Sequence, residues 1–181
     1  MRIILWWNHR RNRRSPGDQT FIEARVMLID ICINSGLSIL DPGFDTPEAR
    51  VMLIAIGMQE SKFSHRTQIS GPARGFWQFE KGGIRGVLNH PSTKQIITNV
   101  CNTLRIPPTE ETCYSAVAYN DTLACVFARL LLWTLPNELP RQGDPDEGWR
   151  QYIMAWRPGK PHRETWDNHY NGAWLKVAGG S

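Results

Sequence analysis

The sequence predicts a mainly helical fold in one domain, and three observations support this prediction. Apolar residues recur at helical spacing in several segments of the 181-residue chain, and long alternating runs of β-branched residues are missing. Helix start and stop residues flank these segments. A chain of this length buries roughly 70% of the surface that it exposes when unfolded, which is enough for one hydrophobic core. We therefore expect about six helices and one long glycine-rich loop.

Two helices are predicted in the first third of the chain. Residues 20–35 carry apolar side chains at helical spacing, and Gly36 follows them as a stop signal. Thr46 can cap the next helix, and Pro47 suits its first position. This second helix should run to about Ser61 and lie buried, because apolar residues surround it almost completely.

The remaining elements follow from the same kinds of signal. Residues 64–89 contain five glycines and little periodicity, which predicts a loop. Four more helices should follow, each bounded by a capping residue or a proline, and the second of them begins at Thr109 or Thr112. We expect these helices at residues 92–104, 109–133, 144–157 and 164–177.

The last third of the chain is rich in aromatic residues. It holds four of the eight tryptophans, together with Tyr152 and Tyr170. At helical spacing, such residues more often pack in a core than form a platform for carbohydrate. We therefore predict that this cluster is structural.

Positive charge is concentrated at the N-terminus. Five arginines lie within the first 14 residues, and the first acidic residue is Asp18. Without these five, the chain has 16 basic and 17 acidic residues, so the net charge of +4 comes from a basic arm at residues 1–18. The folded domain is expected at residues 19–181. Nucleic acid is not a favoured partner, because a binding domain would carry a basic surface along its fold.

Nothing in the sequence predicts membrane insertion, export or metal binding. The longest apolar stretches are far shorter than the ~20 residues of a membrane-spanning helix. Residues 3–7 form a short apolar run that precedes the arginine cluster, whereas a secretory signal places charges before an apolar core of about 7–15 residues. The four cysteines lack CxxC spacing, so we predict reduced structural thiols, no metal and no cofactor. Four cysteines allow three disulfide pairings, and the sequence does not choose among them.

One carboxylate stands where its negative charge is disfavoured. Glu60 ends an apolar helix, at the negative end of the helix dipole, so we expect its pKa to be raised. A carboxyl group that stays protonated near neutral pH can act as a general acid. The alternative is a solvated glutamate at a helix end, which composition alone favours.

Three motifs follow one another from Glu60 onward. Residues 60–63 read Glu-Ser-Lys-Phe, residues 71–78 read Gly-Pro-Ala-Arg-Gly-Phe-Trp-Gln, and residues 118–120 read Ala-Tyr-Asn. In order and spacing they resemble the lytic transglycosylase family of the lysozyme-like superfamily. The family pattern is Glu-Ser-x-aromatic, then Gly-Ala-x-Gly-Leu-Met-Gln, then Ala-Tyr-Asn-Ala-Gly. The resemblance implies a lysozyme-like domain in which Glu60 is the catalytic acid/base.

The resemblance also implies a set of substrate-binding residues. These are Ser61, Gly75, Trp77, Gln78, Tyr119 and Asn120. Tyr119 resembles a tyrosine whose hydroxyl faces the catalytic glutamate, and Asn120 resembles an asparagine beside the reacting sugar. Trp77 either stacks on a sugar ring or packs in the core, and the sequence favours neither.

The reaction that the resemblance implies is cleavage between N-acetylmuramic acid and N-acetylglucosamine in peptidoglycan. Glu60 would protonate the bridging oxygen and then deprotonate the muramoyl 6-hydroxyl, giving a 1,6-anhydro product. A hydrolase would normally need a second carboxylate, for which Glu80 and Asp121 are the candidates. Glu80 precedes Lys81, and we favour a surface ion pair between them over a catalytic role.

Two classes of function stay open at this point. The first is a peptidoglycan-cleaving enzyme similar to phage lysins or virion-associated transglycosylases, which reach the wall from the host cytoplasm or inside the phage particle. The second is a virion structural or adaptor protein, at the head-tail junction or tail, that keeps a lysozyme-like scaffold without its activity. In the second case, the basic arm would contact other virion proteins and the helix at residues 109–133 would serve assembly.

Overall fold

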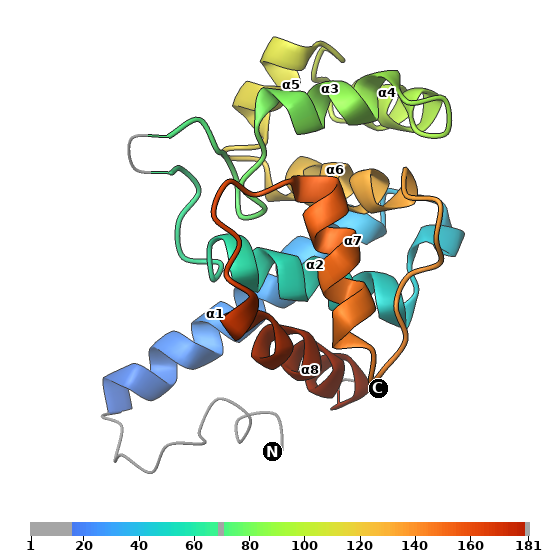
Figure 1. The fold of residues 1–181 in the computed structure, drawn as a ribbon. Helices are drawn as coiled ribbons and strands as arrows, with labels where there is room; N and C mark the ends of the chain where they lie inside the picture. Colours follow the sequence, from blue (N-terminus) through green and yellow to red (C-terminus); the bar gives the residue numbers. More distant parts are fainter. Residues whose placement is uncertain (1–15, 69–70, 180–181) are drawn as a thin grey trace.

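The computed structural model describes residues 16–68 and 71–179, and within these ranges the chain is helical without β-strands (Figure 1). Its elements are α1 (Pro16–Leu37), the short 3-10 helix η2 (Pro42–Phe44), α2 (Pro47–Glu60), α3 (Lys81–Asn89), α4 (Lys94–Thr103), α5 (Glu110–Ala116), α6 (Asp121–Trp133), α7 (Pro145–Trp156) and α8 (Arg163–Gly179). The mainly helical prediction is confirmed. The predicted arm, residues 1–18, lies outside the described residues except for its last three positions.

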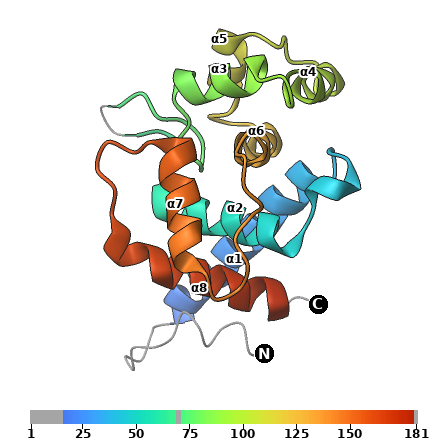
Figure 2. The ribbon, with the colours of Figure 1, turned by 45° about the vertical axis from the view of Figure 1, so that its right-hand side comes forward.

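The helices form two groups joined by α6 (Figures 1 and 2). At one end, α3 packs against both α4 and α5. At the other end, α2 packs extensively against α8, and α7 also contacts α8. Between the groups, α6 contacts helices of both, and ten successive residues from Leu123 to Leu132 are buried. The hydrophobic core is therefore continuous from one group to the other.

The start of α2 follows the local signals in the sequence. The Thr46 side chain accepts a hydrogen bond from the backbone N–H of Ala49 (3.2 Å), and Pro47 occupies the first helical position. The helix runs to Glu60 and is buried along most of its length, as predicted. Glu60 therefore sits at the end of a helix whose position is fixed by core packing.

One predicted boundary and one predicted loop are wrong. Gly36 lies within α1 rather than after it, and a Cβ at this position would overlap the side chain of Cys125 on α6. Residues 81–89, predicted as part of a loop, form α3, whose apolar residues Ile84, Val87 and Leu88 are buried. Close packing explains the glycine at position 36, and burial of one face outweighs the weak helix propensity of the glycines in α3.

The long helix predicted at residues 109–133 is divided in two. The break lies between α5 and α6, and the two axes differ by 119°. The Asn120 side chain accepts a hydrogen bond from the backbone N–H of Leu123 (2.9 Å) and caps the start of α6. In the part of the chain that the structure describes, no single helix is long and apolar enough to cross a membrane; α5 and α6 pass that test only as a bent pair.

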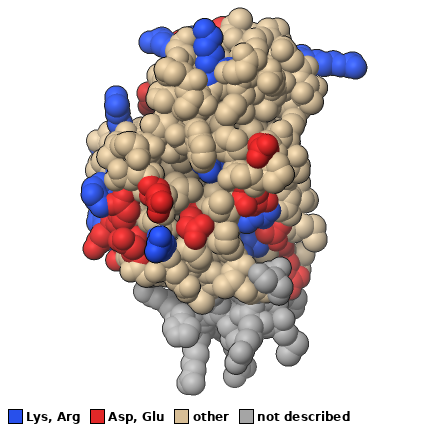
Figure 3. Space-filling view, turned by 90° about the vertical axis from the view of Figure 1, so that its right-hand side faces the viewer, with Lys and Arg blue, Asp and Glu red and all other residues tan. Residues whose placement is uncertain are grey.

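The charged side chains are mixed in sign over the face drawn in Figure 3, where acidic and basic groups alternate across its middle. Several of them form exposed ion pairs, including Lys81 with Glu111 (2.5 Å) and Arg85 with Glu110 (2.6 Å). Such pairs contribute little stability individually. No extended basic surface is seen on this face.

Candidate active site

The candidate site is centred on Glu60, the last residue of α2. Its carboxylate accepts a hydrogen bond from the phenolic hydroxyl of Tyr152, on α7, with an oxygen–oxygen distance of 2.6 Å. Burial raises the pKa of Glu60 to about 7; the hydrogen bond from Tyr152 acts against this rise, and the negative charge of Glu80 adds to it. The sequence prediction of a raised pKa is confirmed. At neutral pH, a group with this pKa is protonated in about half of the molecules.

Tyr152 is held in place by the aromatic residues of α7 and α8. Its ring stacks on Trp166 with a centroid distance of 5.2 Å and an interplanar angle of 12°, and it also contacts Trp149 at 5.3 Å. Burial raises the pKa of the Tyr152 phenol, so the hydroxyl stays protonated and donates to Glu60. The predicted core packing of this aromatic cluster is confirmed for Tyr152, Trp166 and Tyr170.

The role of Tyr152 was missed in the sequence. A tyrosine in an apolar cluster does carry one signal, because a buried phenolic hydroxyl usually finds a hydrogen-bond partner. That signal does not identify the partner, which here lies 92 positions away in the chain. Tyr119, the tyrosine expected to face Glu60, has a side chain that is 78% exposed. The hydrogen bond to Glu60 that was expected from Tyr119 is therefore made by Tyr152. Binding of substrate by Tyr119 stays a prediction.

Ser61, the residue after Glu60, is joined to the second motif through a side-chain hydrogen bond. The Ser61 side chain is buried, and its hydroxyl donates to the backbone carbonyl of Phe76 (2.7 Å) and accepts from the N–H of Phe63 (3.1 Å). The bond to Phe76 joins the start of the segment at residue 61 to the second motif at residues 71–78. The Ser61 hydroxyl is enclosed by protein and holds this segment in place, and its predicted contact with substrate stays a prediction.

The second motif turns sharply at Gly75. Its φ angle is +73°, and a Cβ there would overlap the backbone carbonyl oxygen of Val117. The Gly75 carbonyl accepts a hydrogen bond from the side-chain amide of Gln78 (2.7 Å), a residue that also has a positive φ of 48°. Glycine is therefore required to bring this segment against the junction of α5 and α6. Gln78 folds back onto its own loop, and its predicted contact with a glycan stays a prediction.

Of the two roles that the sequence leaves open for Trp77, the structure has core packing. The Trp77 side chain is fully buried, its indole N–H donates to the backbone carbonyl of Leu53 (2.9 Å), and its ring meets Phe63 edge-on at 5.5 Å. A side chain in this position packs in the core and offers no ring face to a ligand. Asn120, also predicted to bind substrate, uses its side-chain oxygen as the cap of α6.

The two candidate second carboxylates differ in their surroundings. Asp121 is held by Arg66 through two hydrogen bonds of 2.6 and 3.1 Å, so it serves as an ion-pair partner. Glu80 precedes α3 and is exposed, and its charge acts on the pKa of Glu60. Lys81 pairs with Glu111 rather than with Glu80, which corrects the predicted ion pair. Glu80 is therefore the candidate with an electrostatic link to Glu60.

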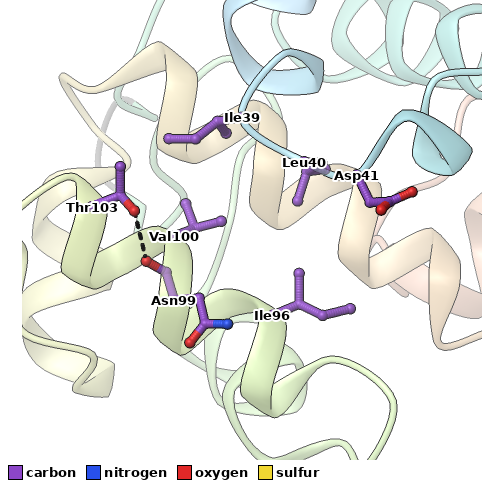
Figure 4. Close-up of a pocket in the computed structure, with 7 residues that line it drawn as sticks. All are labelled: Ile39, Leu40, Asp41, Ile96, Asn99, Val100 and Thr103. Atoms are coloured by element: carbon purple, nitrogen blue, oxygen red, sulfur yellow. Dashed lines mark hydrogen bonds between the residues drawn. The ribbon is translucent and has the colours of Figure 1, made fainter.

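Other features of the described chain lie apart from this site. No group of three or more His, Cys, Asp or Glu side chains in residues 16–68 and 71–179 is arranged to hold a metal ion. A cavity of about 210 Å³ lies between the segment before η2 and helix α4 (Figure 4). Its lining residues are Ile39, Leu40, Asp41, Ile96, Asn99, Val100 and Thr103. Glu60 and Tyr152 are not among them.

Comparison of the chain with protein-family models, curated proteins and solved structures found no match. Its function is therefore inferred from the residues around Glu60 and from the three sequence motifs. Glu60 combines a raised pKa with a fixed hydrogen-bond donor, and this combination is suited to proton transfer near neutral pH.

Proposed function

We propose that this protein cleaves the glycosidic bond between N-acetylmuramic acid and N-acetylglucosamine in peptidoglycan, with Glu60 as the general acid and base. The observation that carries the proposal is the half-buried Glu60 carboxyl group, whose pKa is about 7. The resemblance of three ordered motifs to those of lytic transglycosylases names the substrate. On this proposal the protein acts as a phage lysin or a virion-associated transglycosylase.

The proposed reaction uses the Glu60 proton twice. Protonated Glu60 donates its proton to the bridging oxygen as the bond to the muramoyl anomeric carbon breaks, which gives an oxocarbenium-like transition state. The hydroxyl of Tyr152 donates a hydrogen bond to the carboxylate that forms and stabilises it. The muramoyl 6-hydroxyl oxygen then bonds to the anomeric carbon while its proton passes to Glu60. The acid is regenerated, and no water is consumed.

A hydrolytic outcome would use a second carboxylate. Water would then attack in place of the 6-hydroxyl, and the new end would be a reducing muramic acid. Glu80 is the candidate for this role, because its charge acts on Glu60 while Asp121 is bound by Arg66. The two outcomes share the bond that is cleaved and the residue that protonates it.

Solubilisation of purified peptidoglycan tests this proposal. Wild-type protein is expected to release soluble fragments, and Glu60→Gln is expected to lose at least about a hundredfold of that rate, because general acid catalysis contributes about 10²–10⁴-fold. Glu138→Gln is the matched control, since Glu138 is exposed and its ion pair with Arg141 is long, at 3.8 Å. Equal rates for wild type and Glu60→Gln would overturn the proposal.

The pH dependence of cleavage should respond in opposite directions to two substitutions. Activity requires protonated Glu60 and should fall as the pH rises through about 7. Tyr152→Phe removes a bond that stabilises the carboxylate, so the pKa of Glu60 rises and activity persists to higher pH. Glu80→Gln removes a repelling charge, so the pKa falls and activity declines at lower pH. Initial rates across pH provide the test, and shifts in the same direction would contradict it.

A second candidate function, assembly into a virion, is favoured by one observation on α1. Phe21, Met27 and Ile31 are 76%, 64% and 59% exposed, and Met27 and Ile31, four residues apart, lie on the same side of the helix. Neighbouring exposed apolar residues of this size are typical of interaction surfaces. In this function, α1 and the preceding basic arm would contact other virion proteins.

Deletion of residues 1–14, combined with Met27→Gln and Ile31→Gln, tests the assembly function. The variant should fold, because the two side chains are exposed, but it should be missing from purified particles. Immunoblotting of particles against the total lysate measures incorporation. Normal incorporation would exclude a role for this surface.

A further inference from the structure

Two of the four cysteines lie in contact. Cys101 is near the end of α4 and Cys113 is in α5, and their Sγ atoms are 3.7 Å apart. Both side chains are fully buried, and both thiols are free. Neither residue belongs to the proposed site around Glu60. Cys32 and Cys125 are also free and buried, but no sulfur–sulfur hydrogen bond joins them within the described chain.

We propose that Cys101 and Cys113 form a disulfide bond when the protein meets a disulfide oxidant, and that this bond fastens α4 to α5. A disulfide requires a sulfur–sulfur distance near 2.0 Å, so the two atoms must approach by about 1.7 Å. The segment between α4 and α5 is irregular, and α5 has only seven residues, so a shift of this size needs no change in a long helix.

Cys113 is the attacking thiol in this proposal, because it contacts the segment at Pro107, whose neighbours are exposed. The pKa of Cys113 is lowered by its hydrogen bond with the Cys101 thiol; burial acts against this change, and a backbone hydrogen bond at Thr109 adds to it. The hydrogen bond with Cys113 raises the pKa of Cys101, and burial adds to the rise, so the neutral thiol is favoured there. The Cys113 sulfur also lies 3.7 Å from the backbone oxygen of Pro107, and the neighbouring Pro108 and Thr109 are exposed. Local opening of this segment would admit a small oxidant.

The chemistry is two successive thiol–disulfide exchanges. The Cys113 thiolate attacks a small-molecule disulfide such as oxidised glutathione, which forms a mixed disulfide and releases one thiolate. Cys101 then attacks the Cys113 sulfur, its proton passes to solvent or to the departing thiolate, and the second small thiol leaves. In sum, two protein thiols lose two electrons and two protons, and one small disulfide gains them as two thiols.

The bond would act on the group of helices that lies away from α2 and α8. In this group, α3 packs against both α4 and α5, so the two are held together mainly through a third helix. A disulfide would join them directly and would restrict the unfolded chain between residues 101 and 113. Disulfide bonds persist outside the reducing cytoplasm, and the peptidoglycan layer lies there. The inference itself does not depend on glycan cleavage.

Peptide mapping after oxidation tests the inference. The full-length protein is incubated with oxidised glutathione, its free thiols are alkylated, and it is digested with trypsin without reduction. Cleavage after Lys94, Arg105 and Arg129 places Cys101 in residues 95–105 and Cys113 in residues 106–129. These two peptides should be recovered as one linked species. Because Cys125 lies in the second peptide, the linkage should persist in Cys125→Ala and be lost in Cys113→Ser.

A second readout measures the fastening of the two helices. Oxidation should raise the melting temperature by about 5–10 °C. The disulfide stabilises the folded protein because it restricts the unfolded chain, and in a domain of this length each such gain in stability raises the melting temperature by a few degrees. The rise should vanish with a reducing agent and be absent in Cys101→Ser. Alkylation of both cysteines after prolonged oxidation, or a linkage through Cys32 or Cys125, would overturn the proposal. So would a linked protein with an unchanged melting temperature.

Discussion

Glu60→Gln is expected to stabilise the folded protein at alkaline pH while abolishing glycan cleavage. Burial raises the pKa of Glu60 from 4.5 to about 7, so folding favours the protonated carboxyl group. The stability that protonated Glu60 contributes is complete below pH 4.5 and is lost as the pH rises through about 7. A shift of this size corresponds to about 3 kcal/mol in the free energy of unfolding. Glutamine cannot ionise and keeps an oxygen that accepts from Tyr152.

Denaturant unfolding of both proteins across pH measures this effect. The two free energies of unfolding should nearly coincide at about pH 4 and separate by about 3 kcal/mol at about pH 9, with the variant more stable. The exposed-site control Glu138→Gln should show no pH-dependent difference of this size. A difference between wild type and Glu60→Gln that is constant across pH would mean that Glu60 titrates normally.

Gly75→Ala is expected to destabilise the protein by about 3 kcal/mol or more, because two costs add. Its φ of +73° is strained for a residue with a Cβ, and that Cβ would overlap the backbone oxygen of Val117. The Cβ position is fixed by the backbone of residue 75, and the atom that it meets is itself backbone, so side-chain rotation gives no relief. Val117 lies at the junction of α5 and α6, and a shift there would disturb the segment that follows Glu60.

Gly82→Ala is the matched control for this substitution. Gly82 lies in α3, and a Cβ there has no neighbour within 4 Å. Alanine should raise stability by up to about 1 kcal/mol, because it is the better helix former. Urea denaturation of the two variants gives the comparison. A loss of less than about 1 kcal/mol in Gly75→Ala would show that the loop accommodates a side chain at this position.

The parts of the fold that the sequence predicts well depend on neighbouring residues. The start of α2 is set by Thr46 and Pro47, which act within one helical turn. The raised pKa of Glu60 was predictable for the same reason, since the apolar residues of its own helix indicate burial. These predictions need no knowledge of what the helix packs against.

The parts that the sequence predicts poorly depend on distant residues. The glycines of α3 suggested a loop, but burial of Ile84 and its neighbours against the core decides the outcome. The hydroxyl partner of Glu60 comes from Tyr152 on another helix, and the enclosure of Trp77 depends on Leu53 and Phe63. No local pattern specifies such contacts, because they exist only once the helices have packed.

Mass spectrometry of the fragments that the protein releases from purified peptidoglycan tests the proposed function most directly. New glycan ends at muramic acid are expected in the 1,6-anhydro form, present with wild type and absent with Glu60→Gln. Muramic acid ends that have gained one water would keep Glu60 as the acid and assign the second step to hydrolysis, with Glu80 as the residue to substitute next. Glycan strands left intact by the wild-type protein, or cleaved equally by Glu60→Gln, would contradict the proposed role of Glu60.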